Sequence, residues 1–125
     1  MNIKPLSSLL GIILLGQATA YQMSVVERYS PFINENVQVT LQPMIGNSYG
    51  AMNCGIPASA KRIAVGCTYW SGERPARIEV SNDQRYEWNF EFALIHEVMH
   101  WTLRSKDEVR VDRAAKSMIE WRNNL

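Results

Sequence analysis

The sequence predicts an α+β fold: a small domain with an N-terminal helix, a three-stranded, mostly antiparallel sheet and two further helices. Three segments alternate apolar and polar side chains with a period of two, as half-buried strands do. Apolar residues at helical spacing precede these segments and recur over the last third of the chain. With 125 residues, the chain is long enough for one domain with one modest core.

The first 20 residues have the layout of a secretory signal peptide. Lys4 provides a short positive region, residues 9–16 are mostly apolar, and Ala18-Thr19-Ala20 forms a small-x-small cleavage site. The apolar run is too short to cross a bilayer as a helix. We therefore expect a protein exported to the periplasm or the medium. Its folded domain would be residues 21–125, without membrane association once the leader is removed.

Charge gives little indication of a macromolecular partner. The whole chain carries a formal net charge of +1, and Lys4 is the one charged residue of the leader, so residues 21–125 are balanced. A balanced chain lacks the basic surface that nucleic acids or anionic membranes attract. We expect a monomer that does not bind nucleic acid.

The chain has two cysteines, Cys54 and Cys67. Because export places them in an oxidising compartment, the sequence predicts a disulfide between them. Such a short loop contributes about 3 kcal/mol in the chain-entropy model. The alternative is a pair of zinc ligands, but the chain offers no second Cys/His pair to complete that kind of site.

The elements are expected in a simple order. Spacing of apolar residues predicts a short helix over residues 23–32, ended near Pro31. Alternation predicts strands at residues 36–42, 62–70 and 76–81. Because only a short turn separates the last two strands, they should form a hairpin.

The most informative stretch is His96-Glu97-x-x-His100, within an apolar run that contains no Gly or Pro. On a helix, residues four apart share a face, so both imidazoles can reach one metal ion. Glu97 lies about 100° further round the helix, where it can act on a metal-bound water. These are the 2 histidines of the chain. The alternative is a chance match in which both histidines are ordinary packing residues.

A catalytic zinc ion usually has three protein ligands and one water. With no third histidine and both cysteines assigned to a disulfide, a carboxylate must complete the site. The nearest candidates downstream are Asp107, Glu108 and Asp112.

Helical geometry ranks these three candidates. A capping-box pattern, Ser105 followed by Glu108, predicts a last helix from there to about Trp121. On that helix Glu108 falls in the middle of the apolar face and Asp112 at its edge. Glu108 could instead cap its own helix. Asp112 could accept the second N–H of a ligand histidine, or be a solvated acid beside basic neighbours.

The pattern of these residues resembles that of the gluzincin metallopeptidases, and the length and element order are similar to those of their smallest members, the minigluzincins. The shared pattern is His96-Glu97-x-x-His100 followed by Glu108-x-x-x-Asp112-x-x-Ala115. The resemblance implies Glu108 as third zinc ligand and Asp112 as the carboxylate that supports the site. Val111 stands where the family usually has Ala, and the 7 residues between His100 and Glu108 form a shorter connection than usual.

The resemblance also implies a zincin-like domain and an activity. It implies a secreted metallopeptidase with one Zn²⁺ per chain, peptide or protein substrates, and Glu97 as general base. The strand before the metal helix would be the sheet edge to which an extended substrate adds. That strand comprises Ala76, Arg77, Ile78, Glu79 and Val80. Tyr69 and Tyr86 are candidates to stabilise the oxyanion.

Two other functions fit the sequence. The first is a secreted binding module in which zinc only stabilises a small core. The second is a toxin or effector of metallopeptidase type that acts on one specific protein.

Overall fold

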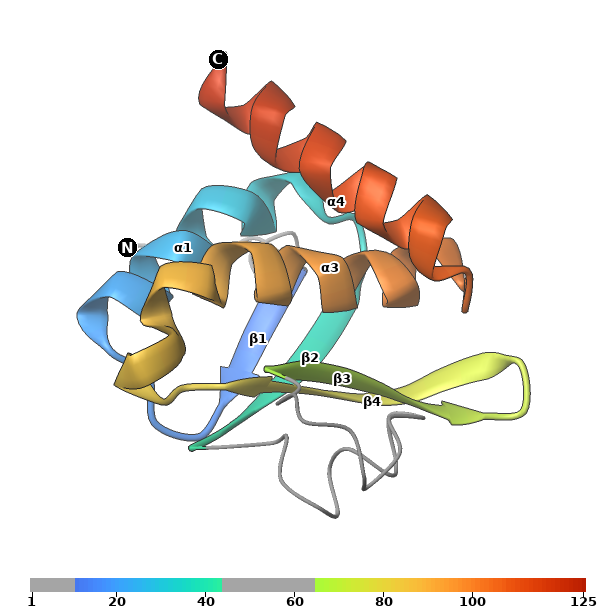
Figure 1. Cartoon of the computed structure of the whole chain (residues 1–125), viewed down its shortest axis with the longest axis horizontal. Helices are drawn as coiled ribbons and strands as arrows, with labels where there is room; N and C mark the ends of the chain where they lie inside the picture. Colours follow the sequence, from blue (N-terminus) through green and yellow to red (C-terminus); the bar gives the residue numbers. More distant parts are fainter. Residues whose placement is uncertain (1–10, 44–64) are drawn as a thin grey trace, which may run out of the picture.

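The computed structural model describes residues 11–43 and 65–125, and in them a mixed four-stranded sheet combines with three α-helices (Figure 1). The α+β class is therefore confirmed. The strands are β1 (Gly11–Leu15), β2 (Asn36–Gln42), β3 (Gly66–Ser71) and β4 (Arg74–Ser81), in the spatial order β1-β2-β4-β3.

The prediction of a three-stranded, mostly antiparallel sheet is wrong. The β1–β2 and β2–β4 pairs are parallel, and only β3 and β4 pair antiparallel as the predicted hairpin. Parallel neighbours need a crossover connection, and helix α1 (Ala20–Tyr29) provides one between β1 and β2. Alternation of side chains identifies a strand, but it does not identify the strand's partner.

β4 lies inside the sheet. Ile78 pairs with Val39 of β2 on one side and with Thr68 of β3 on the other. The prediction that residues Ala76–Val80 form the sheet edge is therefore wrong, because the hairpin inserts β4 between β2 and β3. Among the described strands, β3 is the edge strand on this side of the sheet.

The sheet and two helices enclose the core. α1 and α3 (Phe90–Leu103) cover one face of the sheet, and α4 (Glu108–Asn123) lies against α3 on the outside (Figure 1). Fully buried side chains of the strands meet those of the helices, including Val37, Val39, Ile78, Val80, Val25, Leu94, Ile95 and Val98. Among the described residues, none of the helices has both the length and the apolar character needed to cross a bilayer.

The N-terminal helix begins earlier than predicted. Thr19 caps α1, since its hydroxyl accepts a hydrogen bond from the Gln22 amide at 3.1 Å and its own amide donates one to Oε1 of Gln22 at 3.0 Å. This reciprocal capping box satisfies two helix-terminal donors. The helix ends at Tyr29, and a 3₁₀ turn containing Pro31 follows at Ser30–Phe32.

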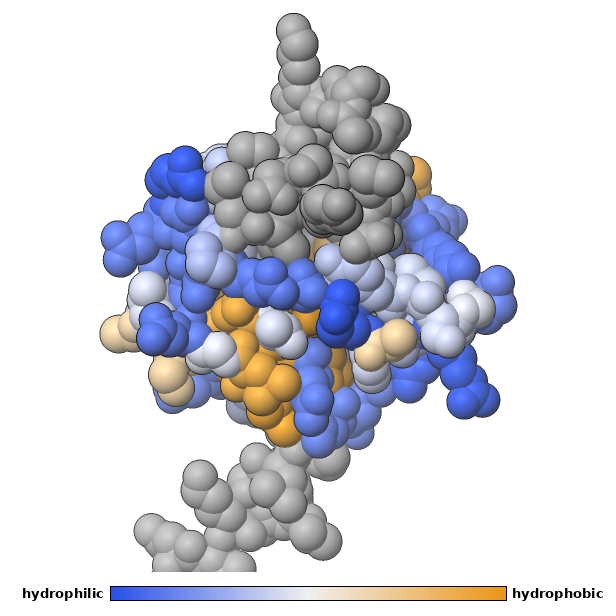
Figure 2. All heavy atoms as spheres, turned by 90° about the horizontal axis from the view of Figure 1, so that it is seen from below, coloured by the Kyte–Doolittle hydropathy of each residue, from blue (hydrophilic) through white to orange (hydrophobic). Residues whose placement is uncertain are grey.

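β1 uses residues that the sequence pattern assigned to a leader. Ile12 is 6% exposed within the core, and by alternation Ile13 and Leu15 lie on the opposite face of the sheet. Figure 2 views the molecule from that side and shows an apolar patch among hydrophilic side chains. A strand that is apolar on both faces has the same composition as the apolar core of a signal peptide. This explains why residues 11–15 fit both a leader and a strand.

We expect that deletion of residues 1–20 destabilises the domain by about 3 kcal/mol or more. The deletion removes the buried side chain of Ile12, worth about 1.5–3 kcal/mol, and the Thr19 cap, worth about 1 kcal/mol. It also removes a 3.0 Å hydrogen bond from the Thr19 hydroxyl to Glu87. Urea unfolding of chains 1–125 and 21–125 measures the difference. Equal stabilities would show that β1 is dispensable and would favour the leader interpretation.

One prediction falls partly outside the described residues. Cys67 is buried on β3, 2% exposed, while Cys54 lies in the segment that the structure does not describe. The Cys54–Cys67 disulfide therefore stays a prediction.

Candidate metal centre

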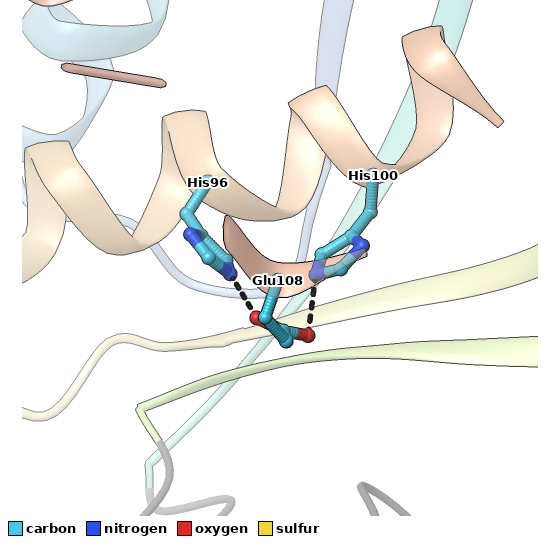
Figure 3. A group of neighbouring side chains, drawn as sticks. All are labelled: His96, His100 and Glu108. Atoms are coloured by element: carbon cyan, nitrogen blue, oxygen red, sulfur yellow. Dashed lines mark hydrogen bonds and ion pairs between the residues drawn. The ribbon is translucent and has the colours of Figure 1, made fainter. Parts of the chain in front are cut away.

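Helix α3 carries both histidines on one face. Its apolar residues hold it against the sheet, while His96 and His100 project toward the start of α4 (Figure 3). Their ring centroids lie 4.9 Å apart, as expected for side chains one helical turn apart. The motif predicted from sequence thus sits on a helix with both imidazoles side by side.

A tight turn brings α4 back to α3. Arg104 adopts a left-handed conformation with φ of 51°, and the next amide, that of Ser105, returns to the carbonyl of His100 at 3.3 Å. This reversal is a common way to end a helix. The short connection before Glu108 is therefore sufficient to return the chain to the histidines.

The capping residue of α4 differs from the predicted one. Asp107, not Ser105, is the N-cap, and its carboxylate accepts hydrogen bonds from the amides of Val109 and Arg110. Ser105 lies two residues earlier, and its hydroxyl oxygen accepts a hydrogen bond from the Asp107 amide. Glu108 is consequently the first residue of the helix and does not act as the third residue of a capping box.

The Glu108 carboxylate joins the two histidines. Its Oε2 lies 2.9 Å from Nε2 of His96, and its Oε1 lies 2.9 Å from Nε2 of His100 (Figure 3). One ligand atom from each residue falls within 4.8 Å of the others. Three side chains predicted as metal ligands from sequence therefore converge on one point.

The predicted burial of Glu108 is wrong. Its side chain is 70% exposed, and the buried face of α4 is formed by Val111 and Ala115 instead. Because the helix begins at Glu108, its side chain reaches across the helix terminus to α3 and does not enter the core. The carboxylate reaches the histidines from the solvent side.

A buried hydrogen bond fixes one nitrogen of the His100 ring. Its Nδ1 lies 2.7 Å from the carbonyl oxygen of Ser105, a contact that is buried. A carbonyl only accepts, so Nδ1 carries the proton and the lone pair of the neutral ring is on Nε2. Nε2 faces Oε1 of Glu108 at 2.9 Å, and either a proton on Nε2 or a metal ion can link these two atoms. Two imidazoles and a carboxylate are a donor set that suits zinc.

Asp112 lies on the other side of the His96 ring. Its Oδ1 is 3.8 Å from His96 Nδ1, too far for a hydrogen bond, and its Oδ2 lies 3.0 Å from Lys116 Nζ. His96 Nδ1 is buried and has no hydrogen-bond partner among the described residues. Asp112 thus lies beside the atom that it was predicted to support. The position on the Nδ1 side favours Glu108 over Asp112 as third ligand.

Glu97 is buried next to the cluster of candidate ligands His96, His100 and Glu108 (the ligand cluster). It is 6% exposed, and the hydroxyl of Thr68 on β3 donates a 2.7 Å hydrogen bond to its Oε1. Burial raises the pKa of Glu97 to about 8, the nearby Glu108 charge adds to the rise, and the hydrogen bond from Thr68 opposes it. A carboxyl group with a pKa near neutrality is suited to take up and release a proton.

Neither tyrosine proposed from sequence joins the ligand cluster in the described part of the chain. The Tyr69 hydroxyl donates to Glu79 at 3.2 Å, and the Arg77 guanidinium stacks on the Tyr69 ring at 4.2 Å. Burial raises the pKa of Tyr69. Tyr86 belongs to the 3₁₀ turn Gln84–Asn89, with the Arg85 guanidinium 5.5 Å from its ring.

A groove extends from the ligand cluster along α4. Its volume is about 480 Å³, and one end contains His96 and Glu108. The remaining lining residues come from successive turns of α4: Val109, Asp112, Arg113, Lys116, Ser117 and Glu120. The groove gives a bound molecule access to the cluster from solvent.

Neither a protein-family model, nor a curated protein, nor a solved structure matches the chain. The geometry of the site and the spacing of its motif are therefore the basis for the function proposed below.

Proposed function

We propose that the protein is a zinc-dependent metallopeptidase of gluzincin type. The observation that carries the proposal is the convergence of His96, His100 and Glu108 beside a buried glutamate, Glu97. A structural zinc site needs only ligands, whereas here a buried carboxyl group, that of Glu97, lies beside the three candidate ligands.

Each residue of the site has its own role in the proposed reaction. A zinc ion held by His96, His100 and Glu108 would lower the pKa of a water and polarise the carbonyl of a peptide bond. The Glu97 carboxylate takes a proton from the attacking water and passes it to the leaving amine. The Ser105 carbonyl holds His100 in the tautomer that leaves Nε2 available.

The placement of β3 supports a peptide substrate. β3 contacts α3, and among the described strands it pairs on one side only, with β4. An edge strand of this kind offers backbone donors and acceptors to an extended peptide. The substrate would then be recognised partly through its main chain.

Export and the Cys54–Cys67 disulfide are part of this proposal. Because Ile12 is buried and Thr19 caps α1, an exported protein would have to keep residues 11–20 in its folded domain. A toxin or effector with a single protein target would use the same site and chemistry.

The experiment is hydrolysis of a mixed peptide library by the zinc-loaded chain, with new termini read by mass spectrometry. We expect cleavage that a chelator abolishes and that added zinc restores. Stoichiometric zinc without cleavage of any peptide or unfolded protein would instead support a binding module stabilised by zinc.

A further inference from the structure

Two residues of β3 approach Glu97 from the same side. Gly66 and Thr68 are two positions apart, so both lie on one face of the strand. The Thr68 hydroxyl donates to Oε1 of Glu97 at 2.7 Å, and both residues are buried, 8% and 6% exposed respectively. The contact joins the sheet to the metal helix at the proposed general base.

Gly66 leaves room for the Glu97 side chain. A Cβ atom at this position would lie 2.9 Å from Glu97 Cγ and 3.0 Å from Oε2. The φ angle of Gly66 is not in the left-handed region, which is reached by Gly11, Gly16 and Gly72. Glycine is therefore required here for space and not for its backbone conformation. Any larger residue would displace the carboxylate.

We propose that Thr68 is a positioning residue that fixes the carboxylate of Glu97 for the proposed hydrolysis. Its hydroxyl engages Oε1, which leaves Oε2 available to exchange a proton with the substrate water. A free glutamate side chain has several rotamers, and a buried hydrogen bond selects one of them. This inference rests on the proposed function for its catalytic consequence, but the contact itself is independent of metal.

The first test compares Thr68→Val, which keeps the shape and removes the donor, with Thr68→Ser, which keeps the donor. Misplacement of a catalytic group costs up to about 100-fold in rate, so we expect Thr68→Val to lower kcat by roughly 10- to 100-fold. KM and bound zinc should be unchanged, and Thr68→Ser should recover most of the rate. Thr40→Val on β2 is the matched control. A Thr68→Val enzyme within twofold of wild type, or no recovery by Thr68→Ser, would overturn the proposal.

The second test uses the metal-free protein and needs no activity. Thr68→Val leaves the buried Glu97 carboxyl without its donor, which should lower the melting temperature by about 4–8 °C. In a Glu97→Ala background the same substitution should have almost no effect, because the partner is absent. Equal falls in melting temperature in the wild-type and Glu97→Ala backgrounds would show that the Thr68 hydroxyl does not act through Glu97. If the chain binds no zinc and cleaves nothing, the proposed function fails. The melting temperatures of Thr68→Val, Glu97→Ala and the double variant still show whether Thr68 stabilises the protein through Glu97.

Discussion

Replacement of Glu108 by alanine is expected to lower zinc affinity by at least about 100-fold, since even the loss of a partner behind a metal ligand costs 10- to 100-fold. Both carboxylate oxygens of Glu108 face the two imidazoles at 2.9 Å, so the substitution removes one of three donors. The fold should survive, because the side chain is 70% exposed and Asp107 caps the helix. Competitive zinc titration and elemental analysis measure affinity and stoichiometry.

Two variants of the same helix serve as references. Asp112→Ala should lose less zinc affinity than Glu108→Ala, because its carboxylate lies 3.8 Å from His96 Nδ1 and on the opposite side of the ring from Glu108. Glu120→Ala, further along the groove, should bind zinc like wild type. Retention of zinc in Glu108→Ala together with its loss in Asp112→Ala would instead assign Asp112 as the third ligand.

Glu97→Gln should keep its zinc and lose hydrolysis. General acid–base catalysis contributes roughly 10²- to 10⁴-fold, and glutamine cannot take up the proton. Glutamine has the same shape, so the Thr68 hydroxyl can still donate to the side-chain oxygen that occupies the place of Oε1. The expected result is therefore a fall in kcat of at least about 100-fold, with wild-type zinc content and little change in KM.

Steady-state kinetics on one cleaved peptide provide the measurement. The matched control is Glu27→Gln, an exposed glutamate on α1, which should hydrolyse the peptide at the wild-type rate. If Glu97→Gln retained more than a tenth of wild-type activity, another residue would have to be the base.

The parts of the fold that depend on local pattern were predictable. β2 occupies residues 36–42 as expected, since its buried side chains alternate along the strand. Helix α3 and the placement of His96 and His100 on one face of it followed from spacing alone. In the sequence Asp107 is considered only as a metal ligand, and the capping-box pattern predicts Ser105 as the helix cap. The actual cap is Asp107, so the helix begins at Glu108, and the prediction that Glu108 is buried is wrong.

The parts that depend on tertiary arrangement were not predictable. β4 alternates like an edge strand, with Arg77 and Glu79 on one side, yet it pairs with β2 and β3. The pattern of residues 11–15 does not distinguish a doubly apolar strand from a leader. Nothing in the sequence around Thr68 marks its contact with Glu97, because this contact depends on how α3 crosses β3.

The measurement that tests the central claim most directly is X-ray absorption on the zinc-loaded protein, followed by a crystal structure. We predict a zinc ion bound by Nε2 of His96, Nε2 of His100 and a carboxylate oxygen of Glu108, with zinc–nitrogen distances of about 2.0–2.1 Å and one water as fourth ligand. A zinc ion enclosed by four protein ligands, or a protein that binds no zinc, would contradict a catalytic metal centre.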